Sequence, residues 1–263
     1  LLLQALPGDA VMIRFENPEL GLSPEQIASI RQSYGADVGV FAQYWHSLTG
    51  ALGGDLGYSA ASGAPVRVLV GPAIPSTFLL AFLGFAVAAI LAGILAFGAI
   101  LSPSGAVASF LRSLPSLFVS VPVFWLGIVL IQVFSFRLGL ISVIRPGPLE
   151  SLILPVLTLA IPISAPMAQV LVLVRNVLRN AALPALTIAG VLLGELIGGA
   201  VVTETVFARF GIGRLTADAL DTQDIPVLQA IVIIAALAFV VVNLAVDLIA
   251  PLIDPRLKRA VSA

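Results

Sequence analysis

Long apolar segments separated by short polar breaks run through most of this 263-residue chain. Five of them hold 22 to 24 residues each, and about 20 apolar residues are enough for a helix to cross a bilayer. In chain order they are Phe78–Leu101, Ser113–Phe136, Ser151–Val174, Ala181–Val202 and Ile225–Val246. We therefore predict an all-α fold, a polytopic bundle of transmembrane helices with five full spans. It forms a single membrane domain over residues 1–263.

Prolines lie within or near the ends of the second and third apolar segments. They are Pro115, Pro122, Pro155, Pro162 and Pro166. A proline removes a backbone hydrogen bond, and a broken helix is tolerated at membrane depth where neighbouring protein satisfies the freed carbonyl groups. The pattern therefore predicts helices that pack against one another rather than isolated anchors in lipid.

Residues 7–72 are the polar part of the chain and precede the first full span. Within them, SPEQIASIRQSYG (23–35) and QYWHSLTGAL (43–52) predict two short helices, and GGDLGYSAASG (53–63) predicts a glycine-rich loop. We interpret Leu1–Ala5 as the tail of a longer apolar segment. Residues 7–72 are then an extracytoplasmic segment between two spans.

The fourth apolar segment combines a glycine stripe with one charge. Gly190, Gly194 and Gly198 recur every four residues and so share one helix face, where they allow another helix to approach closely. That helix belongs either to this subunit or to a partner. Glu195 lies beside the stripe, and a carboxylate at membrane depth must face protein or a water-filled cavity. It either lines a translocation path or is a structural acid bonded to a neighbouring helix.

Composition excludes several classes of protein. Only 10% of the residues are charged and the mean hydropathy is +1.11, whereas a soluble domain is about 25% charged. The chain has no cysteine and one histidine, His46, so we expect no metal site and no enzyme nucleophile with its base. The net charge of −1 offers no basic field for nucleic acid. No G-x-x-x-x-G-K-[ST] phosphate loop occurs, so any ATP is hydrolysed on another chain.

Lysine and arginine in the connecting segments indicate orientation, because cytoplasmic loops are enriched in both. One side carries a compact set in short pieces: Arg112, Arg175, Arg179, Arg256, Lys258 and Arg259. The other side carries Arg137, Arg145, Arg209 and Arg214 in longer loops that also hold acidic residues. The first side is the better cytoplasmic candidate. This orientation puts residues 7–72 and 203–224 outside and the C-terminus inside.

Two further sets of polar residues have alternative interpretations. Asn243 and Asp247 lie one turn apart near the cytoplasmic end of the last span, where they either anchor that end or contact a partner subunit. Asp218, Asp221 and Asp224 follow the fourth span, where they either form a solvated loop face or meet an external protein.

Six stretches of the chain carry a family resemblance. They are LPGDA (6–10), QYWHSLTGALGGDLGYS (43–59), SVPVFWLG (120–127), LRNAALPALTIAG (178–190), GGAVVTETVFARFGIGRL (198–215) and NLAVDLIAPLIDPRL (243–257). In this order they resemble the permease subunits of bacterial peptide/nickel ABC importers, the dipeptide/oligopeptide B-type family. The resemblance covers essentially the whole chain.

The resemblance implies half of the translocation path of an ATP-driven importer for peptides or similar small solutes. Implied partners are a second homologous permease, two cytoplasmic ATPase subunits that hold ATP and Mg²⁺, and an extracytoplasmic substrate-binding protein. It also implies a multi-pass location in the bacterial cytoplasmic (inner) membrane, with no cofactor on this chain. A helix just before Leu1 would bring the number of spans to six.

The chain departs from the family pattern in two places. Relatives have a longer cytoplasmic loop, which docks in the ATPase, between the spans that here are separated only by Arg175–Arg179. Either a segment is missing here or this subunit does not couple to an ATPase in the usual way. We expect the former, with extra residues in the natural chain between Asn176 and Val177 or close by, so Arg175, Asn176, Val177 and Arg179 flank the ATPase-coupling region. The second departure is Phe210, which stands where relatives commonly have proline before the first glycine of FGIG.

Two other classes of membrane protein compete with this interpretation. A secondary transporter should show internal inverted repeats and several intramembrane ionisable residues, but this chain shows no repeat and only Glu195 and Asp247 as candidates. A passive channel for small polar solutes stays open, because one chain does not reveal a pore lining. Co-purification with ATPase subunits and a second permease distinguishes an importer from both.

Overall fold

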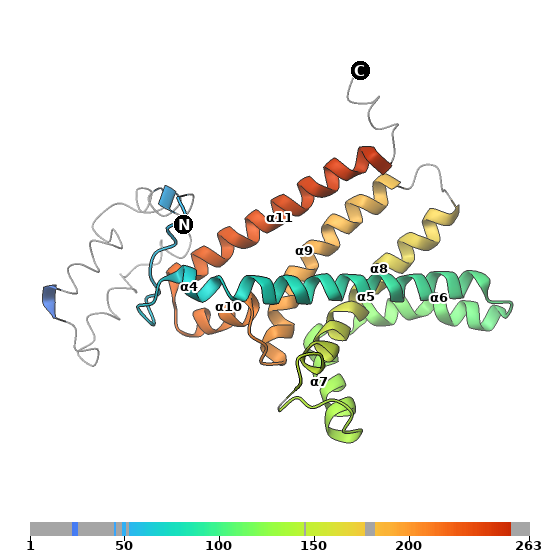
Figure 1. Cartoon of the computed structure of the whole chain (residues 1–263). Coiled ribbons are helices and arrows are strands. Elements are labelled where there is room, and N and C mark those ends of the chain that lie inside the picture. The colour runs from blue at the N-terminus through green and yellow to red at the C-terminus, as the bar shows by residue number, and fades with distance from the viewer. Residues whose placement is uncertain are drawn as a thin grey trace, which may run out of the picture. The chain divides into compact units, whose positions relative to one another are not determined.

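The computed structural model describes residues 53–144, 146–176 and 182–253, together with 23–25, 45 and 49–50. Within these residues the fold is helical, which confirms the predicted all-α class, and one isolated β-bridge joins Tyr58 and Pro65. The helices are α4 (Val66–Val70), α5 (Ala73–Leu101), α6 (Gly105–Ser120), α7 (Val123–Leu130), the π-helix η2 (Ile131–Arg137), α8 (Glu150–Asn176), α9 (Ala182–Val206), α10 (Ile212–Asp221) and α11 (Ile225–Ile253), as Figure 1 shows.

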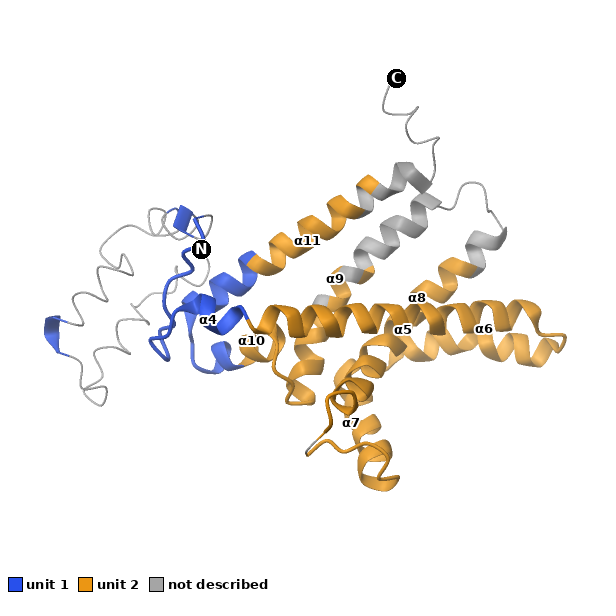
Figure 2. Cartoon of the chain, viewed as in Figure 1, with its two compact units in different colours: residues 1–71, 218–233 blue, residues 72–217, 234–263 orange. Residues whose placement is uncertain are grey.

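The chain divides into two compact units (Figure 2). Unit 1 comprises residues 1–71 and 218–233, and unit 2 comprises residues 72–217 and 234–263. The described part of unit 1 contains the predicted glycine-rich loop, α4 and the ends of two helices that continue into the other unit. Unit 2 holds most of the apolar helices. The single membrane domain over residues 1–263 stays a prediction.

Three helical segments are long and apolar enough to cross a membrane: Val66–Leu101, Glu150–Leu171 and Ile225–Ala245. They contain most of the first, third and fifth predicted spans. From Ala182 on, the fourth predicted span lies in the 25-residue helix α9 (Ala182–Val206). Among the described residues, α9 is not one of the three segments that meet the criteria for a membrane span. The number of candidate spans in the described residues is therefore three, or four with a bent helix pair. Five or six spans stay a prediction.

The second predicted span, Ser113–Phe136, in which the prolines allowed a broken helix, is not one straight helix. The structure has α6 and α7–η2 instead, bent by 104°. The break falls where Val121 precedes Pro122, and both residues adopt extended backbone angles. Proline disfavours the helical conformation of the residue before it and cannot donate a backbone hydrogen bond. The sequence contained this signal, since Pro122 lies in the middle of the predicted segment.

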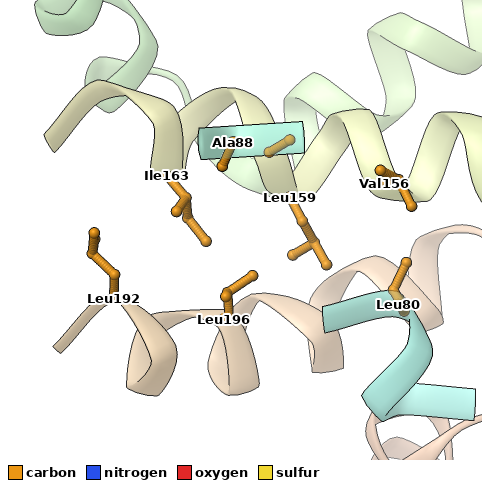
Figure 3. Packing of buried hydrophobic residues seen from close by; sticks show 8 residues of the cluster. Leu80, Ala88, Val156, Leu159, Ile163, Leu192 and Leu196 are labelled. Carbon is orange, nitrogen blue, oxygen red and sulfur yellow. The ribbon is translucent and has the colours of Figure 1, made fainter. Parts of the chain in front are cut away.

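The core of unit 2 lies where α5, α8 and α9 meet (Figure 3). Helix α5 buries a stripe of small residues at four-residue spacing, Gly84, Ala88, Ala92 and Ala96. Small side chains let helix backbones approach closely in a membrane. The approach is tight at Gly84, where an added Cβ would lie 3.3 Å from the Cβ of Leu159 on α8. The larger members of the cluster fill the space around this contact: Leu80, Val156, Leu159, Ile163, Leu192 and Leu196.

Helix α6 runs back alongside α5 (Figure 1). The two helices approach closely at Gly98, where an added Cβ would lie 3.2 Å from the Leu111 side chain. Further along, Ala92 and Leu95 of α5 and Ala168 of α8 form a second buried cluster, against which Leu111, Leu114 and Phe118 pack. Helices α5, α6 and α8 thus form a packed scaffold for α9, the helix that carries the candidate site.

Candidate functional site

Helix α9 carries the predicted intramembrane acid, Glu195. Its side chain is exposed, whereas Leu192, Leu196 and Ala200 of the same helix are buried. Positions 192, 196 and 200 share one helix face because they are four residues apart. That face packs on α5 and α8, so Glu195 points away from the core of its own unit.

The predicted glycine stripe divides between two environments. Gly194 contacts the same chain, because an added Cβ would lie 3.4 Å from the ring of Phe239 on α11. Gly198 is open, with nothing within 4 Å of an added Cβ. Gly190 is helical, but its surroundings lie outside the described part. Among the α9 glycines whose surroundings are described, the tightest contact is at Gly199, where an added Cβ would lie 2.9 Å from Leu159 Cδ2.

A second acid of α9, Glu204, is fully buried at the junction of three helices. Its carboxylate accepts hydrogen bonds from the Thr77 hydroxyl on α5 (2.6 Å) and from the backbone N–H of Gly213 on α10 (2.6 Å). The Thr77 hydroxyl oxygen in turn accepts the Ile212 N–H (2.8 Å). Beside it, the Ser76 hydroxyl donates to the Phe210 carbonyl oxygen (2.5 Å). Donors from two helices thus surround the carboxylate, which makes its burial tolerable.

Glycine is required where the loop before α10 passes this carboxylate. A Cβ at Gly211 would overlap the Glu204 carboxylate, and a Cβ at Gly213 would overlap the Val201 backbone. Ala208, at the start of the loop, adopts a φ of +50°, a left-handed conformation uncommon for a residue with a side chain. The GIG sequence is therefore explained by contact with Glu204. The turn itself forms with Phe210 at the position where the family commonly has proline.

Arg209 lies in the loop that follows α9, five residues after Glu204, and is partly buried. Burial lowers the pKa of the Arg209 guanidinium, because desolvation disfavours its charged form, and the nearby Glu204 carboxylate opposes that shift. The Arg209 backbone N–H also donates to the Glu204 carbonyl oxygen at 2.8 Å. The loop is thus anchored to the end of α9 by its backbone as well as by the carboxylate.

Asp224 forms a comparable cluster in unit 1. Its side chain is buried, and its carboxylate accepts hydrogen bonds from the Ser59 hydroxyl and from the backbone N–H groups of Ala60 (3.0 Å), Ala61 (3.2 Å) and Val227 (3.4 Å). The Val227 contact caps the start of α11. Asp224 therefore holds the glycine-rich loop against α11 and does not face outward, unlike the exposed Asp218 and Asp221. Asp218 and Asp221 are therefore the two remaining candidates for a face that meets an external protein.

The remaining predicted residues lie near helix ends. Asn243 is partly buried on α11, where its amide donates to the Phe239 carbonyl oxygen at 2.8 Å. Asp247 lies on the same helix, with its side chain outside the described part. Arg175 and Asn176 form the last residues of α8, while Val177 and Arg179 lie outside the described residues. The predicted roles of these residues stay predictions.

No group of three or more His, Asp or Glu side chains that could hold a metal ion occurs among the residues that the structure describes. The two buried acids instead bind donors from their own unit. Sequence reasoning missed the role of Glu204 and the buried position of Asp224. The available signal was the order T-E-T-V-F-A-R-F-G-I-G, in which an acid at a span end precedes two closely spaced glycines.

Comparison with known proteins shows which family of proteins this chain resembles. Residues 167–259 match the family model described as binding-protein-dependent transport system inner membrane component. The glutathione transport system permease protein GsiC of Escherichia coli O6:H1 (strain CFT073) is 32% identical over 292 residues, with 98% of this chain and 92% of the relative covered. The same protein from E. coli K12 is 31% identical over 292 residues, and that from Salmonella typhimurium LT2 is 30% identical over 283, with the same coverage.

The high coverage excludes a match confined to one shared segment, and the matching family and relatives are transport components rather than enzymes. Membership in this family implies an inner-membrane location and work with an ATPase, a binding protein and a second permease. The apolar helices of the described residues fit that location. The chain belongs to the family of inner-membrane components of binding-protein-dependent transport systems, and it is a permease subunit of an ABC importer of the peptide/nickel type.

Proposed function

We propose that this permease forms half of a translocation path for small peptides or similar solutes, and that α9 lines the path. The observation that carries the proposal is the exposed Glu195 on a helix that buries a different face, formed by Leu192, Leu196 and Ala200, in the core. A carboxylate at membrane depth faces a water-filled cavity or another protein chain rather than lipid. The open Gly198 lies three residues further along α9 and adds to a face free for contact with the second permease.

The proposed cargo is a small peptide with an ammonium group. A carboxylate in a path of low dielectric constant attracts a peptide's N-terminal ammonium group more strongly than it does in bulk water. The relatives are named for glutathione, a small peptide, so glutathione is the first cargo to test.

The proposed assembly contains a second permease, two ATPase subunits that bind ATP and Mg²⁺, and a substrate-binding protein outside. For coupling, we propose that additional residues between Asn176 and Val177, or close by, contact the ATPase. Support comes from the alignment with the E. coli O6:H1 relative, which extends over 292 positions but includes only 98% of the 263 residues of this chain, so the relative carries residues within the aligned span that this chain lacks. Sequencing the gene across this junction tests the point, since codons that run directly from Asn176 to Val177 would contradict it.

The proposed orientation places residues 7–72 and 203–224 outside. It assumes the five spans expected from the sequence and a sixth before Leu1. Asp218 and Asp221, exposed on α10, would then meet the binding protein. Because the chain has no cysteine, single cysteines report sidedness directly. Asp221→Cys should react with a membrane-impermeant maleimide from outside whole cells and Arg112→Cys should not. The reverse pattern would contradict the orientation.

The deciding experiment measures ATP-driven uptake of glutathione into proteoliposomes that contain the complete transporter. Glu195→Leu should lower uptake by about tenfold, since a hydrogen bond to a charged group contributes about 1.5–3 kcal/mol, while assembly is retained. Glu195→Asp should keep most of the activity. Thr205→Val is the matched control, because Thr205 is an exposed residue of α9 whose hydroxyl bonds within its own helix.

Uptake that persists without ATP would instead support a secondary transporter or a passive channel. Normal uptake by Glu195→Leu in a normally assembled complex would remove α9 from the path. Loss of assembly would identify Glu195 as a contact between subunits.

A further inference from the structure

Helix α10 begins without a capping side chain of its own. The residue before Ile212 is Gly211, and the first N–H groups of a helix need acceptors from elsewhere. Two are supplied by other helices: the Ile212 N–H donates to the Thr77 hydroxyl oxygen on α5, and the Gly213 N–H donates to the Glu204 carboxylate on α9. The start of α10 is therefore formed by long-range contacts rather than by its local sequence.

These contacts are linked to one another. The Thr77 hydroxyl donates its proton to Glu204 while its oxygen accepts from Ile212, so one side chain joins three helices. The neighbouring Ser76 hydroxyl donates to the Phe210 carbonyl oxygen in the preceding loop. All of these residues belong to unit 2. We name the group formed by Ser76, Thr77, Glu204, Phe210, Ile212 and Gly213 the α10 junction.

Opening the α10 junction would separate the Glu204 carboxylate from its hydrogen-bond donors, the Thr77 hydroxyl and the Gly213 N–H. The Glu204 carboxylate is fully buried, and a buried carboxylate without donors is strongly disfavoured. Close packing also holds the junction closed, because no Cβ fits at Gly211 or Gly213 without displacing Glu204 or the α9 backbone. Both features favour a junction that moves as one body.

We propose that Glu204 and Thr77 are positioning residues for transport, which hold α5, α9 and the first turn of α10 together through the whole cycle. A binding protein that docks on α10 then displaces α9, and with it Glu195. This inference rests on the proposed function, in which α9 lines the path and a binding protein meets the outer loops. It assigns a transmitting role to a carboxylate that does not itself contact cargo.

The first arm of the test is amide hydrogen exchange over residues 207–215. It is measured on the complete transporter in lipid nanodiscs, without nucleotide and after trapping with ATP and vanadate. In the wild type, exchange should be equal in the two states. Thr77→Val should accelerate exchange by about tenfold, corresponding to a loss of about 1.4 kcal/mol in local stability, and Thr77→Ser, which keeps the hydroxyl group, should restore it. Faster exchange of the wild type in either state would overturn the proposal, because the junction would then open during the cycle.

The second arm separates transmission from simple anchoring. Thr77→Val and Glu204→Gln should leave ATPase activity without binding protein unchanged, but should lower its stimulation by glutathione-loaded binding protein, and the glutathione taken up per ATP, by about tenfold. Thr77→Ser and the α9 control Thr205→Val should behave like the wild type. A merely structural role would lower the yield of complex and leave stimulation normal in the complexes that remain.

Normal stimulation in Thr77→Val, combined with accelerated exchange, would overturn the transmitting role. If the wild type itself is not stimulated by glutathione-loaded binding protein, the proposed cargo fails, while the exchange measurement still decides whether the junction is rigid.

Discussion

Glu195 and Glu204 lie on the same helix, nine positions apart, and have opposite environments. Glu204 is fully buried and receives hydrogen bonds from α5 and α10, whereas Glu195 is exposed on the chain. The same residue type therefore serves the fold at position 204 and, in our proposal, the path at position 195. One acid is satisfied by its own subunit and fixes the fold. The other requires groups outside this chain, which come from solvent, cargo or a partner subunit.

Adjacent glycines of the same helix show a similar division. Gly199 packs against Leu159 of α8, while Gly198 faces open space. One face of α9 packs within its own unit and another is exposed. A helix of this kind is expected in a subunit whose exposed face binds a partner subunit. The following predictions test this division.

The largest effect is expected at Gly213. In Gly213→Ala the added methyl group would overlap the backbone of Val201, which cannot rotate away as a side chain can. Overpacking of a core typically costs about 1–3 kcal/mol, and a backbone clash belongs at or above the upper end. We expect loss of assembled transporter from membranes, measured by quantitative blotting. Gly93→Ala is the control, since nothing lies within 4 Å of its added Cβ, and equal loss in both variants would contradict the prediction.

Next comes the replacement of each acid by leucine. Glu204→Leu leaves the Gly213 N–H and the Thr77 hydroxyl without their acceptor, which should cost about 3 kcal/mol. Glu195→Leu breaks no contact with its own core, so stability should change by about 0.5 kcal/mol or less. Thermal unfolding of the detergent-solubilised complex measures both. Equal destabilisation by the two substitutions would show that the different burial of Glu195 and Glu204 does not determine their contributions to stability.

Asp224 should behave like Glu204, with a smaller effect. Asp224→Ala removes the cap of α11 and the acceptor for Ser59, Ala60 and Ala61, which should cost about 2 kcal/mol. The exposed Asp221 provides the matched control, since Asp221→Ala should leave the thermal midpoint unchanged. Protease sensitivity of residues 53–63 should rise only in the first variant.

The smallest effect is expected for the neighbouring glycines. Gly199→Ala places a methyl group 2.9 Å from Leu159 Cδ2, a flexible side-chain end that moves aside at a cost of about 1 kcal/mol. In Gly198→Ala the added methyl group meets no atom within 4 Å in the described part of the chain, so the change should leave the subunit itself intact and weaken only association with the second permease. Co-purification of the two permeases measures the difference. Unchanged co-purification would place Gly198 away from the interface.

The general architecture was predictable because it depends on local sequence. A run of 22 to 24 apolar residues predicts a spanning helix wherever it occurs, and most of the predicted segments became long helices. Pro122 also acts locally: it was among the prolines expected to permit a broken helix, and the helix pair bends by 104° beside it. The family was predicted from short stretches and confirmed by relatives that cover almost the whole chain.

The buried acids were not predictable in the same way. Thr77 and Glu204 are separated by 127 positions, and Ser59 and Asp224 by 165. No pattern within a single helix indicates which distant donor will meet a carboxylate. Glu195 drew attention because it lies at the centre of an apolar run, whereas Glu204 and Asp224 lie at helix ends, where a charged residue is common and looks solvated.

The small-residue stripe of α5 has a consequence for biosynthesis. Gly84 packs against Leu159, which leaves the ribosome about 75 residues later, a delay of roughly 4–15 s at ordinary rates of translation. Helix α6 follows α5 directly, and its Leu111 contacts Gly98. The α5–α6 hairpin can therefore form first, while the stripe itself waits for α8. During that interval the stripe on α5 waits for the later helices α8 and α9, whose Leu159 and Leu196 meet Gly84, so insertion of α5 precedes its packing.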